Sequence, residues 1–391
     1  MLSLTVTQQQ KIRALNEDSF REYCETCGYH ADEHAGDLLR IGKEQLEQAL
    51  GGIKIEDVPN DERRSAISKM RSATDYFEFR TVEHERRRRA ICATLTQFAP
   101  KLPITYDYVA RLCQRLGLAE PSPTKPGSIA ELIESVPIVS NWDFQFNASV
   151  ASLVDYIPCI CISELLLTTC DSFLHRVAPL AIEFKEKARP AKIEDCAAMG
   201  QRPDFMDELY GCISMAMGKS NFVKRGAVET DQKTYSTVHV MVEASVQAVW
   251  YHEFGHLLQG HLEQLRSHQL EFEADCFAFQ VLSQESRNKS LDVWLGLGGL
   301  APLVIIDIIE TISQSPESES HPSGRRRIGE ALNVFKRVNP RLVQPAVDYL
   351  RSLAAVCAPT LDKHWGVSLD YYYLSEQDRG RIFQNDKYGY R

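Results

Sequence analysis

The chain has 391 residues, of which 44 % are hydrophobic, 25 % charged and 9 % aromatic. This composition excludes disordered, collagen-like and disulfide-scaffold proteins and is typical of a globular chain that buries a core. The formal net charge of −9 argues against a protein that coats nucleic acid or an anionic membrane, because both tasks need a dominant basic field. The length allows two or three domains, or one catalytic domain with a helical appendage.

Several features indicate a cytoplasmic protein. The first residues, from Met1 to Val6, lack the basic region and the long apolar core of a secretory signal. The eleven cysteines are odd in number and scattered, which favours buried free thiols over a disulfide framework. The most apolar stretch, from Val293 to Ile309, is interrupted by glycines and a proline and is interpreted as too short and too broken to span a bilayer.

Residues 1–120 are predicted to form a helical amino-terminal domain that recognises or regulates. From Gln8 to Leu118, apolar positions repeat every three and four residues among charged ones. The basic run from Glu83 to Arg89 is interpreted as a solvated helix face, and contact with phosphate or an acidic partner is the alternative. The segment 121–128, rich in proline, serine and glycine, predicts a linker after this domain.

Residues 129–391 are predicted to form a mostly helical α+β domain. The stretches 149–162 and 238–242 are apolar and partly β-branched, which indicates strands. Helical periodicity is found around 173–186 and 242–260. A polar segment, 313–320, predicts an exposed mobile loop before the terminal helices.

The segment from His252 to His256 reads His-Glu-Phe-Gly-His, an HExxH motif within a helical pattern. Residues four apart stack on one face of a helix about 6 Å apart, so both imidazoles can approach one tetrahedral Zn²⁺. Zinc lowers the pKa of a water that it binds to about 7, and Glu253 beside the histidines can accept the proton as general base. The motif therefore predicts a hydrolytic zinc site, with chance occurrence on an amphipathic helix as the alternative.

A catalytic zinc site needs a third protein ligand, and a second amphipathic helix over 271–279 offers one. Gly260 is expected to end the first helix, and antiparallel packing would bring the first turn of the second helix back toward the zinc. Glu271 and Asp275 share a face, so Glu271 is predicted to bind the metal while Asp275 orients a ligand imidazole. The alternative, that Glu271 and Glu273 are surface acids, does not explain the narrow face that Ala274 and Ala278 give this helix.

These motifs resemble a known family. The segment from His252 to His261, followed by Glu271 to Ala278, is similar to the patterns HExGHxxxGH and ExxA[ND]xFA of gluzincin metallopeptidases of the ImmA/IrrE type. The resemblance implies a zincin-like metallopeptidase domain. It implies that His252, His256 and Glu271 are zinc ligands. It also implies that Glu253 is the general base. The chain also resembles the Lit phage-exclusion peptidases, which act on a cytosolic protein.

Two further histidines lie near these motifs. The segment from His321 to Ile328 is similar to the HP(x)4RI element of HtpX and CAAX-prenyl-protease relatives. His321 is predicted to be catalytic, as a donor to the oxyanion of a tetrahedral intermediate, and capping of the arginines at 325–327 is the alternative. His261 is interpreted as a helix-end residue, because helical continuation would rotate it away from the two ligand histidines.

The amino-terminal region contains a second cluster of potential metal ligands. Thiolates and imidazoles are proper zinc ligands, but this spacing lacks the long loop that separates the two ligand pairs of ordinary structural sites. A helix with these cysteines on its apolar face and the histidines at the edge of that face explains the same residues. The cluster consists of Cys24, Cys27, His30 and His34.

The complete HExxH motif and its glutamate helix predict a cytosolic zinc-dependent endopeptidase that hydrolyses peptide bonds in a specific protein substrate. The alternative is a regulatory or binding protein on a metallopeptidase scaffold, in which zinc is structural or missing and the basic helix contacts nucleic acid or protein. A purely structural helical protein would require both motifs to be accidents. No membrane partner is expected.

Overall fold

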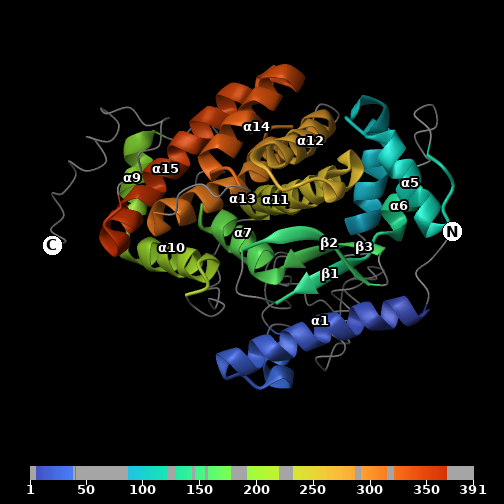
Figure 1. The fold of residues 1–391 in the computed structure, drawn as a ribbon. Helices are drawn as coiled ribbons and strands as arrows, with labels where there is room; N and C mark the ends of the chain where they lie inside the picture. Colours follow the sequence, from blue (N-terminus) through green and yellow to red (C-terminus); the bar gives the residue numbers. More distant parts are fainter. Residues whose placement is uncertain are drawn as a thin grey trace. The chain divides into compact units, whose positions relative to one another are not determined.

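The computed structural model describes residues 6–37, 40, 87–121, 129–142, 146–154, 157–177, 192–219, 232–286, 292–314 and 321–367. These residues are mostly helical and include one three-stranded sheet (Figure 1), so the predicted α+β, mostly helical class is confirmed. The predicted basic run, linker and mobile loop lie largely outside the described ranges, which lack residues 83–86, 122–128 and 315–320. Residues 87–98 are helical, with Arg89 exposed and Arg87 and Arg88 half-buried.

The chain divides into two compact units. One comprises residues 1–165, 229–235 and 256–264, and the other comprises residues 166–228, 236–255 and 265–391. Helix α11 (Gln232–Gln259) contributes residues to both, and helix α7 (Glu164–Arg176) begins in one and continues in the other. Each unit is described by itself.

The sheet of the first unit is mixed. Its strands are β1 (Ile138–Asn141), β2 (Ala148–Val154) and β3 (Ile157–Ser163), in the order β1-β3-β2. Strand β3 pairs in parallel with β1, with Ile138 opposite Ile160, and antiparallel with β2, with Ala148 opposite Ile162. The apolar stretch 149–162 therefore does form strands, as its β-branched composition predicts.

Helix α1 (Val6–Cys27) packs against this sheet. Ile12 lies in a buried cluster with Val139 of β1 and Cys159 of β3. The Ser19 hydroxyl donates to the Asn141 side chain at 2.8 Å and accepts a hydrogen bond from the backbone amide of Trp142. An apolar stripe along α1 thus covers one part of the sheet, as helical periodicity predicts.

The first unit also contains α5 (Tyr106–Leu116), α6 (Ala130–Ser135) and two short 3₁₀ turns, Ala99–Lys101 and His261–Glu263. Thr105, which precedes α5, contacts the carboxyl-terminal end of α11. Its backbone amide donates to the Leu258 carbonyl, and its hydroxyl donates to the Gln259 carbonyl, each at 3.0 Å. Both carbonyls belong to the last turn of α11, where no intrahelical donor remains.

The second unit is built from helices. They are α9 (Ile193–Gly200), α10 (Pro203–Ala216), α12 (His268–Ser286), α13 (Asp292–Ser313), α14 (Gly324–Val338) and α15 (Val343–Trp365), with a 3₁₀ turn at Pro340–Leu342. Helix α12 packs against α13 and α14, and α15 packs against α9 (Figure 1). The stretch 238–242, interpreted as a strand, instead lies inside α11. Val238 and Val242 are buried in this long helix, because tertiary packing overrides β-propensity.

Helix α13 corrects one expectation from the sequence. The stretch around Val293 to Ile309 forms one continuous helix of 22 residues through its glycines and Pro302, so it is neither short nor broken. The helix is long and apolar enough to cross a membrane, but 72 % of its most apolar window is buried inside the protein. Such burial is typical of a core helix in a protein that does not span a membrane.

All eleven cysteines carry free thiols, and most are buried, as predicted. The amino-terminal cysteines and histidines are not among the described groups whose ligand atoms lie close enough for a metal. Instead, Cys24 is buried in α1, and the His34 ring stacks on Tyr29 with ring centroids 4.5 Å apart. The buried Cys24 agrees with the helix-face interpretation, but α1 ends at Cys27, so His30 and His34 do not lie at the edge of its apolar face.

Candidate metal centre

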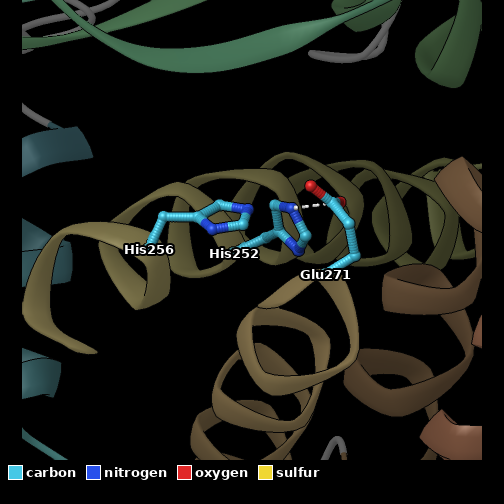
Figure 2. A group of neighbouring side chains, drawn as sticks. All are labelled: His252, His256 and Glu271. Carbon is cyan, nitrogen blue, oxygen red and sulfur yellow. Dashed lines mark ion pairs between the residues drawn. The ribbon is translucent and has the colours of Figure 1, made fainter. Parts of the chain in front are cut away.

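Three potential metal ligands lie together where α11 ends and α12 begins. His252 and His256 are one turn apart on α11, and Glu271 is in the first turn of α12 (Figure 2). One ligand atom from each lies within 4.8 Å of the others, and all three residues are half-buried. Within the described ranges, this is the one group of three or more such ligands that could hold a metal ion. The structure therefore brings together the residues predicted to bind zinc.

Small residues allow α11 and α12 to approach each other closely. A Cβ atom added to Gly255 would lie 3.2 Å from the Ala274 Cα and 3.2 Å from the Phe277 Cβ. Such distances are tighter than ordinary van der Waals contact, so a larger residue at Gly255 or Ala274 would push the helices apart. The narrow face at Ala274, noted in the sequence, thus sets how near Glu271 comes to the histidines.

Asp275 orients the first histidine. The His252 Nδ1 lies 2.9 Å from the Asp275 Oδ1, and the His252 Nε2 lies 3.4 Å from the Glu271 Oε2. Burial lowers the pKa of His252, but the hydrogen bond and charge of Asp275 outweigh burial and raise this pKa to about 10. A metal that binds Nε2 must displace a proton from the imidazole. The carboxylate keeps Nδ1 as the donor and directs Nε2 toward Glu271.

Arg327 of α14 holds Asp275 in place. Its Nε donates to the Asp275 Oδ2 at 2.7 Å, its Nη2 donates to the Asp275 Oδ1 at 2.8 Å, and its Nη1 lies 3.9 Å from the Glu271 Oε2. Burial alone would raise the pKa of Asp275, but the charge and hydrogen bonds of Arg327, with those of His252, hold it below its usual value. The carboxylate therefore stays ionised in a buried position.

The start of α14 is fixed by its own caps. The Ser323 hydroxyl accepts from the backbone amide of Arg326 at 3.4 Å, and Glu310 of α13 accepts from the backbone amide of Gly324 at 2.8 Å. A carboxylate at a helix amino terminus also interacts favourably with the helix dipole. These contacts define the first turn of α14, from which Arg327 extends.

Glu253 lies between the two histidines in sequence and is almost completely buried, with 3 % of its surface exposed. Burial raises the pKa of its carboxyl to about 7, and the charge of nearby Glu271 adds to this effect while His252 opposes it. A carboxylate whose pKa is close to neutrality is suited to accept and return a proton.

His261 lies at the carboxyl-terminal end of α11, as the sequence predicts, but close to a ligand histidine. Helix α11 ends at Gln259, and Gly260 adopts the left-handed conformation at φ 79°. The chain turns back, so the His261 Nδ1 lies 2.9 Å from the His256 Nδ1. His261 is thus a helix-end residue outside the described ligand group, as predicted, but the turn at Gly260 brings its ring to His256 where helical continuation would rotate it away.

His321 lies close to the metal group. Its Nε2 is 3.9 Å from the Glu271 Oε1, and 49 % of its side chain is exposed. The side chain thus approaches the ligand set from the solvent side. This position is compatible with contact to a substrate group, and its catalytic role stays a prediction.

Sequence reasoning did not predict the contacts of Arg327 and His261. Arg327 is part of the HP(x)4RI element, so its motif was found, but its guanidinium was considered only as a capping partner of His321. His261 follows the glycine that ends α11, and that glycine is the sequence signal for a reversal of the chain.

The donor set fits zinc. Two imidazole nitrogens and one carboxylate leave a fourth position for water or substrate, as in catalytic zinc sites. Asp275 behind His252 supplies the outer hydrogen bond that zinc-binding histidines usually have. The same three residues would also accept other divalent transition metals, among which availability decides.

A comparison with known protein families covers the segment that contains these residues. Residues 214–343 match a family model described as Peptidase U49. No curated protein and no solved structure matches the chain. The matched segment contains the metal group and the residues around it, namely His252, Glu253, His256, His261, Glu271, Asp275, His321 and Arg327. The match supports a peptidase, a hydrolase that acts on proteins.

Proposed function

We propose that the protein is a cytoplasmic zinc metalloendopeptidase that cleaves a specific protein substrate. The observation that carries the proposal is the convergence of His252, His256 and Glu271 within 4.8 Å of one another, with buried Glu253 on the same helix turn as the histidines. These residues lie in the segment that matches a peptidase family. A non-catalytic protein would have no need for a general base at this place.

When bound, Zn²⁺ would supply Lewis acidity, which acidifies a water molecule and polarises the scissile carbonyl. Glu253 would accept the proton from that water and then donate it to the leaving amine, a cycle for which a pKa near 7 is well suited. Asp275 and Arg327 would keep the His252 ring fixed throughout. The outer residues therefore maintain geometry while Glu253 moves the proton.

His321 is proposed to stabilise the oxyanion of the tetrahedral intermediate. Its imidazole lies 3.9 Å from a ligand carboxylate and is half-exposed, so it can reach a carbonyl oxygen bound beside the metal group. A positioned donor at a developing oxyanion lowers the barrier by about 3–4 kcal/mol. Removing it should therefore affect turnover more than binding.

The decisive experiment substitutes the proposed base. Glu253→Gln should keep one metal per chain and lose hydrolysis of a proteome-derived peptide library by at least two orders of magnitude, because an amide cannot accept the proton. Glu273→Gln is the matched control, since Glu273 accepts a hydrogen bond from Gln269 on α12 and is not among the three ligands of the metal group. Wild-type rates in Glu253→Gln, or a metal-loaded wild type that cleaves nothing, would favour the regulatory alternative.

A further inference from the structure

The two proposed ligand histidines have different partners. His252 is held by a carboxylate, whereas His256 is held by another imidazole, that of His261. The His256 and His261 rings meet edge to face, with centroids 5.0 Å apart and planes at 72°. His261 is 6 % exposed, so water competes little for this hydrogen bond.

The backbone places His261 at this position. Gly260 has φ 79°, which an L side chain rarely adopts, and a Cβ atom there would lie 3.0 Å from the Tyr108 ring. The following 3₁₀ turn, His261–Glu263, begins at His261 itself. The reversal is therefore built for a residue without a side chain, and it returns the next imidazole to the last turn of α11.

A hydrogen bond between two Nδ1 atoms contains one proton, and its location decides which nitrogen of His256 can bind a metal. If His256 donates, its proton sits on Nδ1 and its Nε2 lone pair can bind the metal. If His261 donates, the neutral His256 carries its proton on Nε2, and that nitrogen cannot be a ligand. Metal binding through Nε2 therefore requires His261 to accept.

His261 is not itself part of the ligand group. The described cluster comprises His252, His256 and Glu271 only, and the Nδ1 of His261 is directed at His256. We propose that His261 is a positioning residue that fixes His256 with Nδ1 protonated and Nε2 toward the metal. The proposal rests on the metal site of the proposed function and assigns a role to a residue outside the predicted ligand set.

Two substitutions separate this role from simple packing. His261→Phe keeps an aromatic ring but removes the acceptor, whereas His261→Asn loses the ring and keeps an acceptor oxygen near the Nδ1 position. We expect His261→Phe to weaken Zn²⁺ binding by about 10- to 100-fold, measured by competition with a chromophoric chelator. His261→Asn should bind within a few-fold of the wild type. The opposite order would show that the ring matters only for packing.

The matched control is His268→Phe, the same exchange at a histidine of α12 that contacts Arg326 and is not among the three ligands of the metal group. Its Zn²⁺ affinity should equal that of the wild type. Melting of each metal-free variant shows whether it is folded. A folded His261→Phe with wild-type affinity would overturn the proposal.

A measurement on the unaltered protein covers the case in which His261→Phe does not fold. Nitrogen-15 NMR of the zinc-loaded protein, labelled at histidine, should show His256 bound through Nε2 with a protonated Nδ1. Binding through Nδ1 would overturn the proposal. If the wild type binds no Zn²⁺ at all, the proposed function fails, whereas tight wild-type binding that His261→Phe leaves unchanged contradicts only the role of His261.

Discussion

Arg327 grips both oxygens of the Asp275 carboxylate, with its Nε 2.7 Å from Oδ2 and its Nη2 2.8 Å from Oδ1. This bidentate pair is buried and joins α14 to α12 directly behind His252. Two parallel charge-assisted hydrogen bonds fix the plane of the carboxylate as well as its position. Helices α11, α12 and α14 therefore meet through a chain of contacts from His252 to Asp275 to Arg327.

Loss of the guanidinium should destabilise the chain. Arg327→Met leaves the buried Asp275 carboxylate with only the His252 imidazole beside it, and removal of one partner of a buried ion pair costs about 3–5 kcal/mol. We expect the free energy of unfolding of the metal-free protein to fall by this amount in urea titrations. Arg327→Lys should recover only part of it, because an ammonium cannot bond to both oxygens.

The double variant Arg327→Met with Asp275→Asn is the control for this interpretation. It removes both charges of the pair together and should be more stable than Arg327→Met alone, since the buried carboxylate that lost its guanidinium is also neutralised. Additive losses in the double variant would mean that the two residues act independently.

Each proposed ligand should be needed for the metal. Purified wild type is expected to contain one zinc per chain, and His252→Ala, His256→Ala and Glu271→Ala should each lose most of it in elemental analysis, because two remaining ligands bind zinc weakly. His268→Ala should retain the metal. Full stoichiometry in any of the three ligand variants would show that its residue is not a ligand.

Removal of the His321 imidazole distinguishes two roles by sign. If it donates to the oxyanion, His321→Ala lowers kcat by about two orders of magnitude or more, with zinc content and KM nearly unchanged. If it caps the metal group, basal activity rises instead. Steady-state kinetics on a cleaved peptide measures both. Unaltered kinetics would leave only the alternative in which His321 caps the arginines at 325–327.

Asp307 gives a pH-dependent test of stability. It is buried in apolar α13, its Oδ1 lies 3.6 Å from the Arg325 Nε, and burial raises the pKa of its carboxyl to about 6 against the effect of Arg325. The pKa in an unfolded chain is about 3.9. Because the folded state holds the proton more tightly, the free energy of unfolding should fall by about 2 kcal/mol as pH rises from about 4 to about 6.

Asp307→Asn removes this dependence. The variant should exceed the wild type in Tm above about pH 6, and the advantage should vanish toward pH 4, where the wild-type carboxyl is protonated. Asp362→Asn, at an exposed position of α15, is the control and should leave the pH profile of Tm unaltered. A constant difference between Asp307→Asn and the wild type at all pH values would contradict the assignment.

The placement of the metal-binding residues on α11 and α12 could be predicted from the sequence because both helices depend on local patterns. An HExxH motif in a helical repeat places His252 and His256 on one face whatever surrounds them. Glu271 and Asp275 likewise share a face through their spacing alone. Only one tertiary assumption, the return of α12 onto α11, was needed, and the short connector made it the simplest arrangement.

Features set by distant contacts were not predictable in the same way. Residues 238–242 have strand-like composition, yet they belong to a helix buried along one side. The partnership of Arg327 and Asp275 spans 52 positions, so no local repeat reveals it. The position of His261 depends on the left-handed conformation of Gly260. The sequence indicates that Gly260 ends the helix, but it does not indicate where the chain goes next.

Thr105 limits local opening of the last turn of α11. The last turn of a helix ordinarily frays, because its final carbonyls have no donors and open to water. In α11 this turn carries His256, and Thr105 donates to the carbonyls of both Leu258 and Gln259. Local opening there must break these two bonds first, so the backbone amides around His256 should exchange with solvent slowly for residues so close to a helix end.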